Sequence, residues 1–191
     1  MLKSTPNYNQ KCRINREKGM TFIEVLIALV IMVTGILGAV AMQATAKKGS
    51  FDAMQRSLAS SLAQDIIERM RSNNATSLNS YEGTNYGESL EGGVATASCA
   101  TAAGCSSANM ALNDLYEWEV ALMGADVKQG ELDAGGLVDA RACIVVDGAT
   151  NNQVTVVVTW QGRTDTVDGS TESCGLTGES RRQVLVEAFI Y

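Results

Sequence analysis

Histidine is absent from this 191-residue sequence, and proline is nearly absent, since Pro6 is its single instance. Without histidine, neither a Ser-His-Asp triad nor a Cys-His nucleophile can form, and an HExxH metal motif is excluded as well. No other catalytic constellation is recognisable, so the sequence predicts a protein that is not an enzyme. The length leaves room for one modest soluble domain beside a leader and a membrane segment.

Positive charge is scarce outside the N-terminal region. Residues 1–19 carry five basic residues and one acidic residue, a net charge of +4, whereas the whole chain carries −6. The remaining residues therefore carry a net charge of −10. Such an acidic body repels phosphate backbones, so nucleic acid is not an expected partner.

Cysteine pairs with CxxC spacing are also missing, although the chain has five cysteines. Cys12 lies in the basic N-terminal region, and the other four are Cys99, Cys105, Cys143 and Cys174. An even number of cysteines beyond a membrane segment indicates disulfides formed in an oxidising compartment such as the periplasm. A four-thiolate zinc site is the weaker alternative, because no CxxC pair offers the usual chelate. We expect no metal and no cofactor.

One long apolar run, residues 20–42, stands out against the polar remainder. As a helix it would span about 34 Å at ~1.5 Å per residue, which is enough to cross a bilayer. Five basic residues precede the run and only Lys47 and Lys48 follow it closely, so the positive-inside rule predicts a cytoplasmic N-terminus and an exported body. A secretory signal peptide cut at residues 44–46 (Ala-Thr-Ala) fits less well, because the apolar run has full spanning length.

Glu24 places a carboxylate near the start of this apolar run. A charged group costs ~2.5–3.5 kcal/mol at the bilayer centre on insertion scales, less near an interface, and usually has a partner. One interpretation is that Glu24 simply extends to the headgroups. The other is that cleavage before Met20 creates a new α-amino group, which Glu24 of a neighbouring subunit neutralises in an assembly of parallel helices.

The sequence KGMTFIE at residues 18–24, followed by the apolar run, resembles the class III signal of type IV prepilins and pseudopilins. The resemblance implies cleavage after Gly19 by a prepilin peptidase, N-methylation of Met20, and a role for Glu24 in subunit assembly. Two features depart from the family pattern: the leader is longer than usual, and methionine replaces the more common phenylalanine at the first mature position. Neither departure removes the glycine or the charged leader.

An amphipathic stripe continues the apolar run, with apolar residues at every fourth position: Met54, Leu58, Leu62, Ile66 and Met70. The pattern predicts one helix over residues 21–72, with its first half in lipid and its second half on a globular head. Gly35, Gly38 and Gly49 interrupt the helix; they either permit close helix packing or allow local unwinding in a filament, where pilins usually have a proline. The predicted boundaries are a cleaved leader at 1–19, a transmembrane half-helix at 20–46, an amphipathic half-helix at 47–74 and an exported head at 75–191.

The head sequence predicts an α+β fold, which the pilin resemblance also implies. Residues 75–105 are polar and small and indicate loops, and a helix capped by Ser106 or Ser107 follows. The predicted buried face of that helix consists of Leu112, Leu115, Trp118 and Leu122. Residues 137–146, 154–161 and 183–190 alternate with period two, and residues 147–152 supply a turn, so we expect a small antiparallel sheet covered by the long helix.

The four exported cysteines allow three pairings, of which we favour Cys99 with Cys105 and Cys143 with Cys174, while the other pairings stay open. Two acidic stretches could bind calcium, but neither has calcium-loop spacing, so solvated loop charge is the better interpretation. These stretches are Asp126, Glu131, Asp133 and Asp139, and Asp165, Asp168 and Glu172.

Residues 42–43, Arg56 and the segments LAQDI (62–66) and ERMRSN (68–73) resemble PilV-type minor pilins, also called type IV pilus modification proteins. The resemblance implies a minor pilin that helps to prime pilus assembly, sits at or near the tip, and supports adhesion and twitching motility. From the residues alone, Arg69 and Arg71 are interpreted as solvated charges beside the apolar stripe.

The implied partners are other minor and major pilins, the prepilin peptidase/methyltransferase, the inner-membrane assembly machinery, the lipid bilayer and a tip adhesin. The implied location is the bacterial inner membrane and, after assembly, a pilus on the cell surface. Two alternatives stay open. A type II secretion pseudopilin shares the leader and Glu24, and a membrane-anchored periplasmic domain would use the apolar segment only as an anchor.

Overall fold

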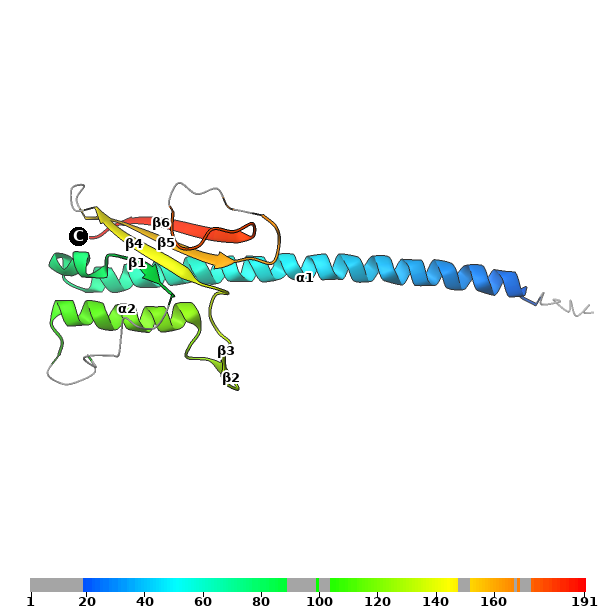
Figure 1. Ribbon diagram of the computed structural model, residues 1–191, viewed down its shortest axis with the longest axis horizontal. Helices are drawn as coiled ribbons and strands as arrows, with labels where there is room; N and C mark the ends of the chain where they lie inside the picture. The colour runs from blue at the N-terminus through cyan, green and yellow to red at the C-terminus, as the bar shows by residue number, and fades with distance from the viewer. Residues whose placement is uncertain (1–18, 89–98, 100–103, 148–151, 167, 169–172) are drawn as a thin grey trace, which may run out of the picture. The chain divides into compact units, whose positions relative to one another are not determined.

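The computed structural model describes residues 19–88, 99, 104–147, 152–166, 168 and 173–191 (Figure 1). Its elements are α1 (Phe22–Ser72), the 3-10 helix η1 (Ala75–Tyr81), β1 (Gly83–Tyr86), α2 (Ser107–Met123), β2 (Lys128–Gln129), β3 (Leu132–Asp133), β4 (Arg141–Asp147), β5 (Gln153–Gln161) and β6 (Arg181–Phe189). The chain divides into two compact units between Ala44 and Thr45, a boundary that falls inside α1. The predicted leader, apart from Gly19, and most of the predicted turn at 147–152 lie outside the described residues.

The long predicted helix is confirmed as α1, which covers 51 residues. In the second unit its buried side chains follow helical spacing, as the amphipathic stripe predicted. They are Gln55, Ala59, Leu62, Ala63, Ile66, Ile67 and Met70. Met54, which we expected in this stripe, is 57% exposed. Gln55 lies at the buried position instead, where its Oε1 accepts a hydrogen bond of 3.0 Å from the backbone N–H of Val138.

The second predicted helix is α2, and both of its ends follow the expected chemistry. The Ser106 side chain accepts a hydrogen bond from the backbone N–H of Asn109, as an N-cap does. At the other end, Gly124 adopts a left-handed conformation, and a Cβ there would lie 1.9 Å from the nitrogen of Gly136, so only glycine fits. Leu112 was wrongly assigned to the buried face: it is 48% exposed, because the buried row begins one position earlier, at Ala111.

The predicted antiparallel sheet is present, with strand order β1-β4-β5-β6. The three long strands lie where the alternating sequence predicted them, and one row across the sheet pairs Cys143 with Val157 and Val157 with Leu185. β1 and η1 were not predicted, since residues 75–105 read as loop. β1 is a polar four-residue strand that pairs with β4, so its conformation comes from a tertiary contact rather than from its own pattern.

The core of the second unit lies where α1 meets both the sheet and α2 (Figure 1). Alternate residues of β4 and β5 supply its apolar side chains: Ala142, Ile144, Val154, Val156, Val158 and Trp160. From α2, Trp118 is fully buried, and its Nε1 donates a 2.8 Å hydrogen bond to the carbonyl oxygen of Leu62 in α1. Each fully buried side chain of this size stabilises the fold by roughly 1.5–3 kcal/mol, and the indole hydrogen bond fixes how α2 sits on α1.

Candidate functional site

The first residues of α1 form a capped helix start. The carbonyl oxygen of Thr21 accepts hydrogen bonds from the backbone N–H groups of Glu24 (3.1 Å) and Val25 (3.3 Å). The Glu24 carboxylate turns back toward this end, with Oε2 3.4 Å from the Thr21 nitrogen and 3.5 Å from its Oγ1. This is the carboxylate half of a capping box, and negative charge here also complements the helix dipole. The Thr-x-x-Glu spacing of residues 21–24 is the signal by which this role can be found in the sequence.

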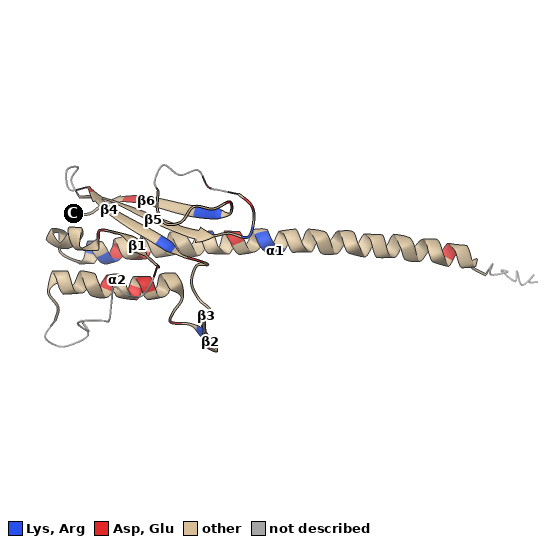
Figure 2. Cartoon of the chain, viewed as in Figure 1, with Lys and Arg blue, Asp and Glu red and all other residues tan. Residues whose placement is uncertain are grey.

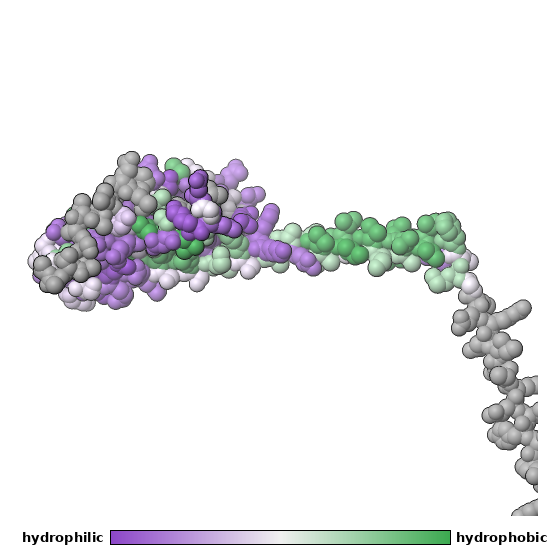
Figure 3. Space-filling model, turned by 90° about the horizontal axis from the view of Figure 1, so that it is seen from below, coloured by the Kyte–Doolittle hydropathy of each residue, from purple (hydrophilic) through white to green (hydrophobic). Residues whose placement is uncertain are grey.

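The apolar side chains after Glu24 are exposed along the whole first half of α1. Exposed fractions of the large ones range from 39% at Val25 to 76% at Met42. Figure 3 shows this stretch as a continuous hydrophobic surface, and among the described residues α1 is the one helix with the length and composition to cross a membrane. Such a surface is unfavourable in water, at roughly 25 cal/mol per Å², so it fits membrane anchoring.

Several glycines near this segment are not required by the fold of the single chain. A Cβ at Gly19, Gly35 or Gly38 would meet no atom within 4 Å among the described residues. Gly124 differs, because neighbouring backbone leaves no room for a side chain there. A requirement for glycine at positions 19, 35 and 38 would therefore have to come from a processing enzyme, from lipid or from another subunit.

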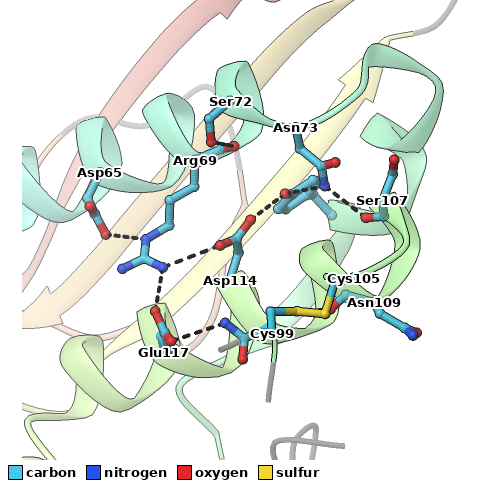
Figure 4. A network of polar contacts seen from close by, with 12 residues as sticks. Asp65, Arg69, Ser72, Asn73, Cys99, Cys105, Ser107, Asn109, Asp114 and Glu117 are labelled. Carbon is cyan, nitrogen blue, oxygen red and sulfur yellow. Dashed lines mark hydrogen bonds and ion pairs between the residues drawn. A yellow bond between two sulfur atoms is a disulfide. The ribbon is translucent and has the colours of Figure 1, made fainter. Parts of the chain in front are cut away.

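A polar network connects the second half of α1 to α2, with Arg69 at its centre (Figure 4). The Arg69 guanidinium lies 3.0 Å from the carboxylate of Asp65, 3.4 Å from Asp114 and 2.8 Å from Glu117. The prediction that Arg69 is simply solvated is wrong: its side chain is 29% exposed and bridges two helices. Arg71 comes closer to that prediction, since its side chain is 46% exposed and pairs with Glu68 of the same helix.

The same network extends to η1 through Tyr81, which is fully buried. The Tyr81 hydroxyl donates a 2.7 Å hydrogen bond to Asp114 and accepts a 2.9 Å hydrogen bond from the side-chain amide of Asn73. That amide also donates to the backbone carbonyl of Ser107 at the start of α2. Three elements are thus joined by charge-assisted hydrogen bonds around a single buried carboxylate.

These surroundings shift the pKa values of the groups involved. Burial alone would lower the pKa of Arg69, but Glu117 and Asp65 raise it overall, so the guanidinium stays charged. The hydrogen bond from Arg69 lowers the pKa of Glu117. Two residues further along α2, burial raises the pKa of Glu119, partly offset by a hydrogen bond from the backbone N–H of Gly87. The pKa of Tyr81 is raised by burial and by its bond to Asp114. The network is therefore suited to hold the head together rather than to transfer protons.

Four of the cysteines are joined in the structure as Cys99–Cys105 and Cys143–Cys174, the pairing that we favoured. Their Cα atoms lie 5.3 Å and 5.9 Å apart, within the usual range for disulfides. The second disulfide links β4 to the segment before β6 and packs on Val157 and Leu185, on the sheet face opposite the main core.

A second polar cluster ties the β5–β6 connection to α1. Asp52 accepts a hydrogen bond from the Thr164 hydroxyl and lies 3.7 Å from the Arg182 guanidinium. Arg182 in turn pairs with Asp168 at 3.3 Å, and Asp168 also pairs with Arg56 of α1 at 3.2 Å. The interpretation of Asp168 as solvated loop charge is therefore wrong, because both of its carboxylate oxygens contact arginines.

Asp139 was also interpreted as solvated charge, and the structure corrects this as well. Its carboxylate lies 2.9 Å from Arg181 and 3.4 Å from Arg141. Burial lowers the pKa of Arg181, and Asp139 opposes that effect. No group of three or more potential metal ligands occurs among the described residues, and Glu172 of the second acidic stretch lies outside them.

Comparison with known protein families gives two adjacent matches. Residues 14–40 match the prokaryotic N-terminal methylation motif, and residues 41–116 match the family described as type IV pilin Tt1218. No curated protein and no solved structure matches the chain. The first match covers Gly19, Met20 and Glu24, and the second covers the head half of α1 through most of α2. With a long apolar helix that continues into an α+β head, the chain is similar to type IV pilins over residues 41–116 and carries a match to the prepilin N-methylation motif.

Proposed function

We propose that this chain is a minor subunit of a type IV pilus, of the PilV type, that helps to prime assembly at or near the tip and thereby supports adhesion and twitching motility. A prepilin peptidase/methyltransferase cleaves the leader 1–19 after Gly19 and methylates Met20. The half-helix 20–46 then holds the subunit in the inner membrane, with the N-terminus cytoplasmic and the head 75–191 exported on the half-helix 47–74. The subunit acts by association and not by catalysis.

The observation that carries the proposal is the exposed apolar half of α1 with a single carboxylate at its start. Glu24 lies within hydrogen-bonding reach of Thr21, next to the residue that becomes the N-terminus after cleavage. The new α-amino group would therefore form close to a carboxylate, in a segment whose other side chains can only be covered by lipid or by other helices. Among the described residues of the single chain, Glu24 interacts only with Thr21 at the start of its own helix, whereas in a bundle of parallel subunits it would also meet the α-amino group of a neighbour.

The first test is the intact mass and N-terminal sequence of the membrane-extracted protein from cells with and without prepilin peptidase. We expect a chain that starts at methylated Met20 only when the peptidase is present. Gly19→Val should block this cleavage, whereas the matched control Gly49→Ala, which also fills open space, should be processed normally. A chain that still starts at Met1, or that is cut near Ala46, would overturn the proposal.

The minor and pilus-specific parts of the proposal need a separate test. Quantitative mass spectrometry of sheared pili should find the processed chain at a small fraction of the major subunit, and deletion of its gene should reduce pilus number and twitching. A chain that is processed but missing from pili, with loss of protein export on deletion, would instead identify a secretion pseudopilin. A stoichiometry near that of the main subunit would contradict the minor role.

A further inference from the structure

Basic residues of the head are almost all paired with carboxylates. Six arginines make ion pairs: Arg56, Arg69, Arg71, Arg141, Arg181 and Arg182. Figure 2 shows this mixing of basic and acidic residues on α1 and around α2. Lys128 also has an interaction partner. Among the described residues, Lys47, Lys48 and Arg163 are the cations whose charged groups contact no carboxylate.

Each of these three cations neighbours Phe51 of α1. Lys47 and Lys48 precede Phe51 by four and three residues in α1, so the two lysines and Phe51 occupy one side of the helix. The Arg163 guanidinium stacks on the Phe51 ring, 4.0 Å from its centroid, which is a cation–π contact. The Arg163 backbone is held in place by a 2.8 Å hydrogen bond from its N–H to Asp52. We call Lys47, Lys48 and Arg163 the basal cluster.

The basal cluster follows the apolar run at a defined distance. Lys47 lies five residues beyond Met42, which is about 7.5 Å along a helix at ~1.5 Å per residue. The headgroup layer on each side of a bilayer is roughly 5–8 Å thick. When residues 20–42 span the hydrocarbon core, Lys47 and Lys48 therefore reach the headgroup layer. Their side chains are exposed, as is that of Arg163, so a ligand can approach all three.

We propose that the basal cluster binds the phosphate groups of anionic phospholipids at the outer surface of the membrane that the apolar segment spans. This inference rests on the membrane insertion in the proposed function and adds a specific lipid partner to it. The positive charge of the basal cluster favours anionic over zwitterionic headgroups. The cluster also offsets the repulsion between an anionic membrane surface and the acidic remainder of the body. The stacking on Phe51 pre-orients Arg163, so that less side-chain freedom is lost on binding.

The test uses the full-length processed protein in nanodiscs of phosphatidylcholine with a minor fraction of phosphatidylglycerol. Native mass spectrometry then counts the lipids that remain bound when the nanodisc is disrupted. We expect phosphatidylglycerol to be enriched on the wild-type protein relative to the nanodisc composition. The variant K47Q/K48Q should bind it about fivefold more weakly per charge removed. K47R/K48R should keep the enrichment, because both charges remain.

Two controls separate this inference from other outcomes. R71Q/K128Q removes the same charge from positions outside the cluster and should leave the enrichment unchanged. Equal enrichment in wild type and K47Q/K48Q, or none in wild type, overturns the inference. Carbonate extraction and the mass of the N-terminus report insertion and processing separately, so a failure of the proposed function would appear there and not in the lipid count.

Discussion

Arg69 and Arg71 lie two residues apart on α1, yet their surroundings differ. Arg69 bridges to two carboxylates of α2 and is part of the network around buried Asp114, whereas Arg71 pairs with a neighbour on its own helix in water. Sequence spacing alone gives both the same role, because it shows which side of the helix a residue occupies but not what packs there. The difference depends on where α2 docks.

Replacement of these two arginines by methionine should separate the two roles. Arg69→Met leaves Asp114 without its cation and removes hydrogen bonds to charged groups, so we expect the free energy of unfolding to fall by about 1.5–3 kcal/mol. Arg71→Met removes an exposed pair and should cost about 0.5 kcal/mol or less. Denaturant unfolding of the full-length protein in detergent, followed by circular dichroism, measures both. Equal losses would mean that the network adds nothing beyond a surface pair.

Glu117 and Glu119 should make opposite contributions to the pH dependence of stability. The pKa of Glu119 is raised above 4.5, so its stabilising contribution is present below about pH 4.5 and is lost as pH rises through the folded-state value. Glu119→Gln, which can still accept the Gly87 hydrogen bond, should therefore raise the melting temperature more at pH 7 than at pH 4. The pKa of Glu117 is lowered, so its contribution is present above about pH 4.5 and is lost on acidification.

Glu117→Gln is the matched control, and it should lower the melting temperature at pH 7 with little effect near pH 3. Melting curves of both variants over this pH range give the comparison directly. A Glu119→Gln variant that loses stability at pH 7 would show that the buried carboxylate is needed in its charged form. If the change in melting temperature is the same at every pH for both variants, the surroundings of Glu117 and Glu119 do not shift the pKa of either carboxylate.

At the level of elements, the sequence predicted those with a strong period of their own. α1, α2 and the three long strands have apolar residues at helical or alternating positions, and their caps at Ser106 and Gly124 follow local rules. β1 and η1 were not predicted, because they are short and polar. Pairing with β4 stabilises β1, and the hydrogen bond between Asn73 and Tyr81 stabilises η1. The ion pairs of Asp139 and Asp168 escaped for the same reason: each joins segments far apart in the chain.

The two disulfides should differ in their effect on stability, because they close loops of different length. The Cys143–Cys174 bond spans 31 residues and the Cys99–Cys105 bond spans six. The chain-entropy relation gives about 3.7 kcal/mol for the first and about 2.2 kcal/mol for the second. We expect the double serine variant at 143 and 174 to lose more stability than that at 99 and 105, measured by thermal unfolding under the same conditions. The reverse order would show that contacts near Cys99 outweigh loop length.

For the molecule as a whole, two kinds of surface meet in one chain. The second unit has its own core and ion pairs, whereas the first half of α1 has an exposed apolar surface that no other described residue covers. Either lipid or a bundle of other α1 helices can cover that surface. The hydrophobic free energy of the surface is similar in both environments, because lipid tails are as apolar as the side chains of a helix bundle. Transfer from membrane to filament therefore has to be driven by specific contacts, and the one charged group of this segment is the strongest candidate.

Glu24 is that group, and its replacement should affect assembly without affecting insertion. Glu24→Gln keeps an oxygen that can accept from the Thr21 N–H, so the helix start is retained, but it removes the charge that could neutralise the α-amino group of another subunit. Removal of a charge from an apolar segment also favours insertion. We expect normal cleavage after Gly19, full retention in the membrane fraction, and at least a tenfold lower amount in sheared pili, measured by quantitative mass spectrometry. Thr21→Val, which alters the cap but keeps Glu24, is the control and should still assemble. Normal incorporation of Glu24→Gln would show that the carboxylate serves only to cap its own helix.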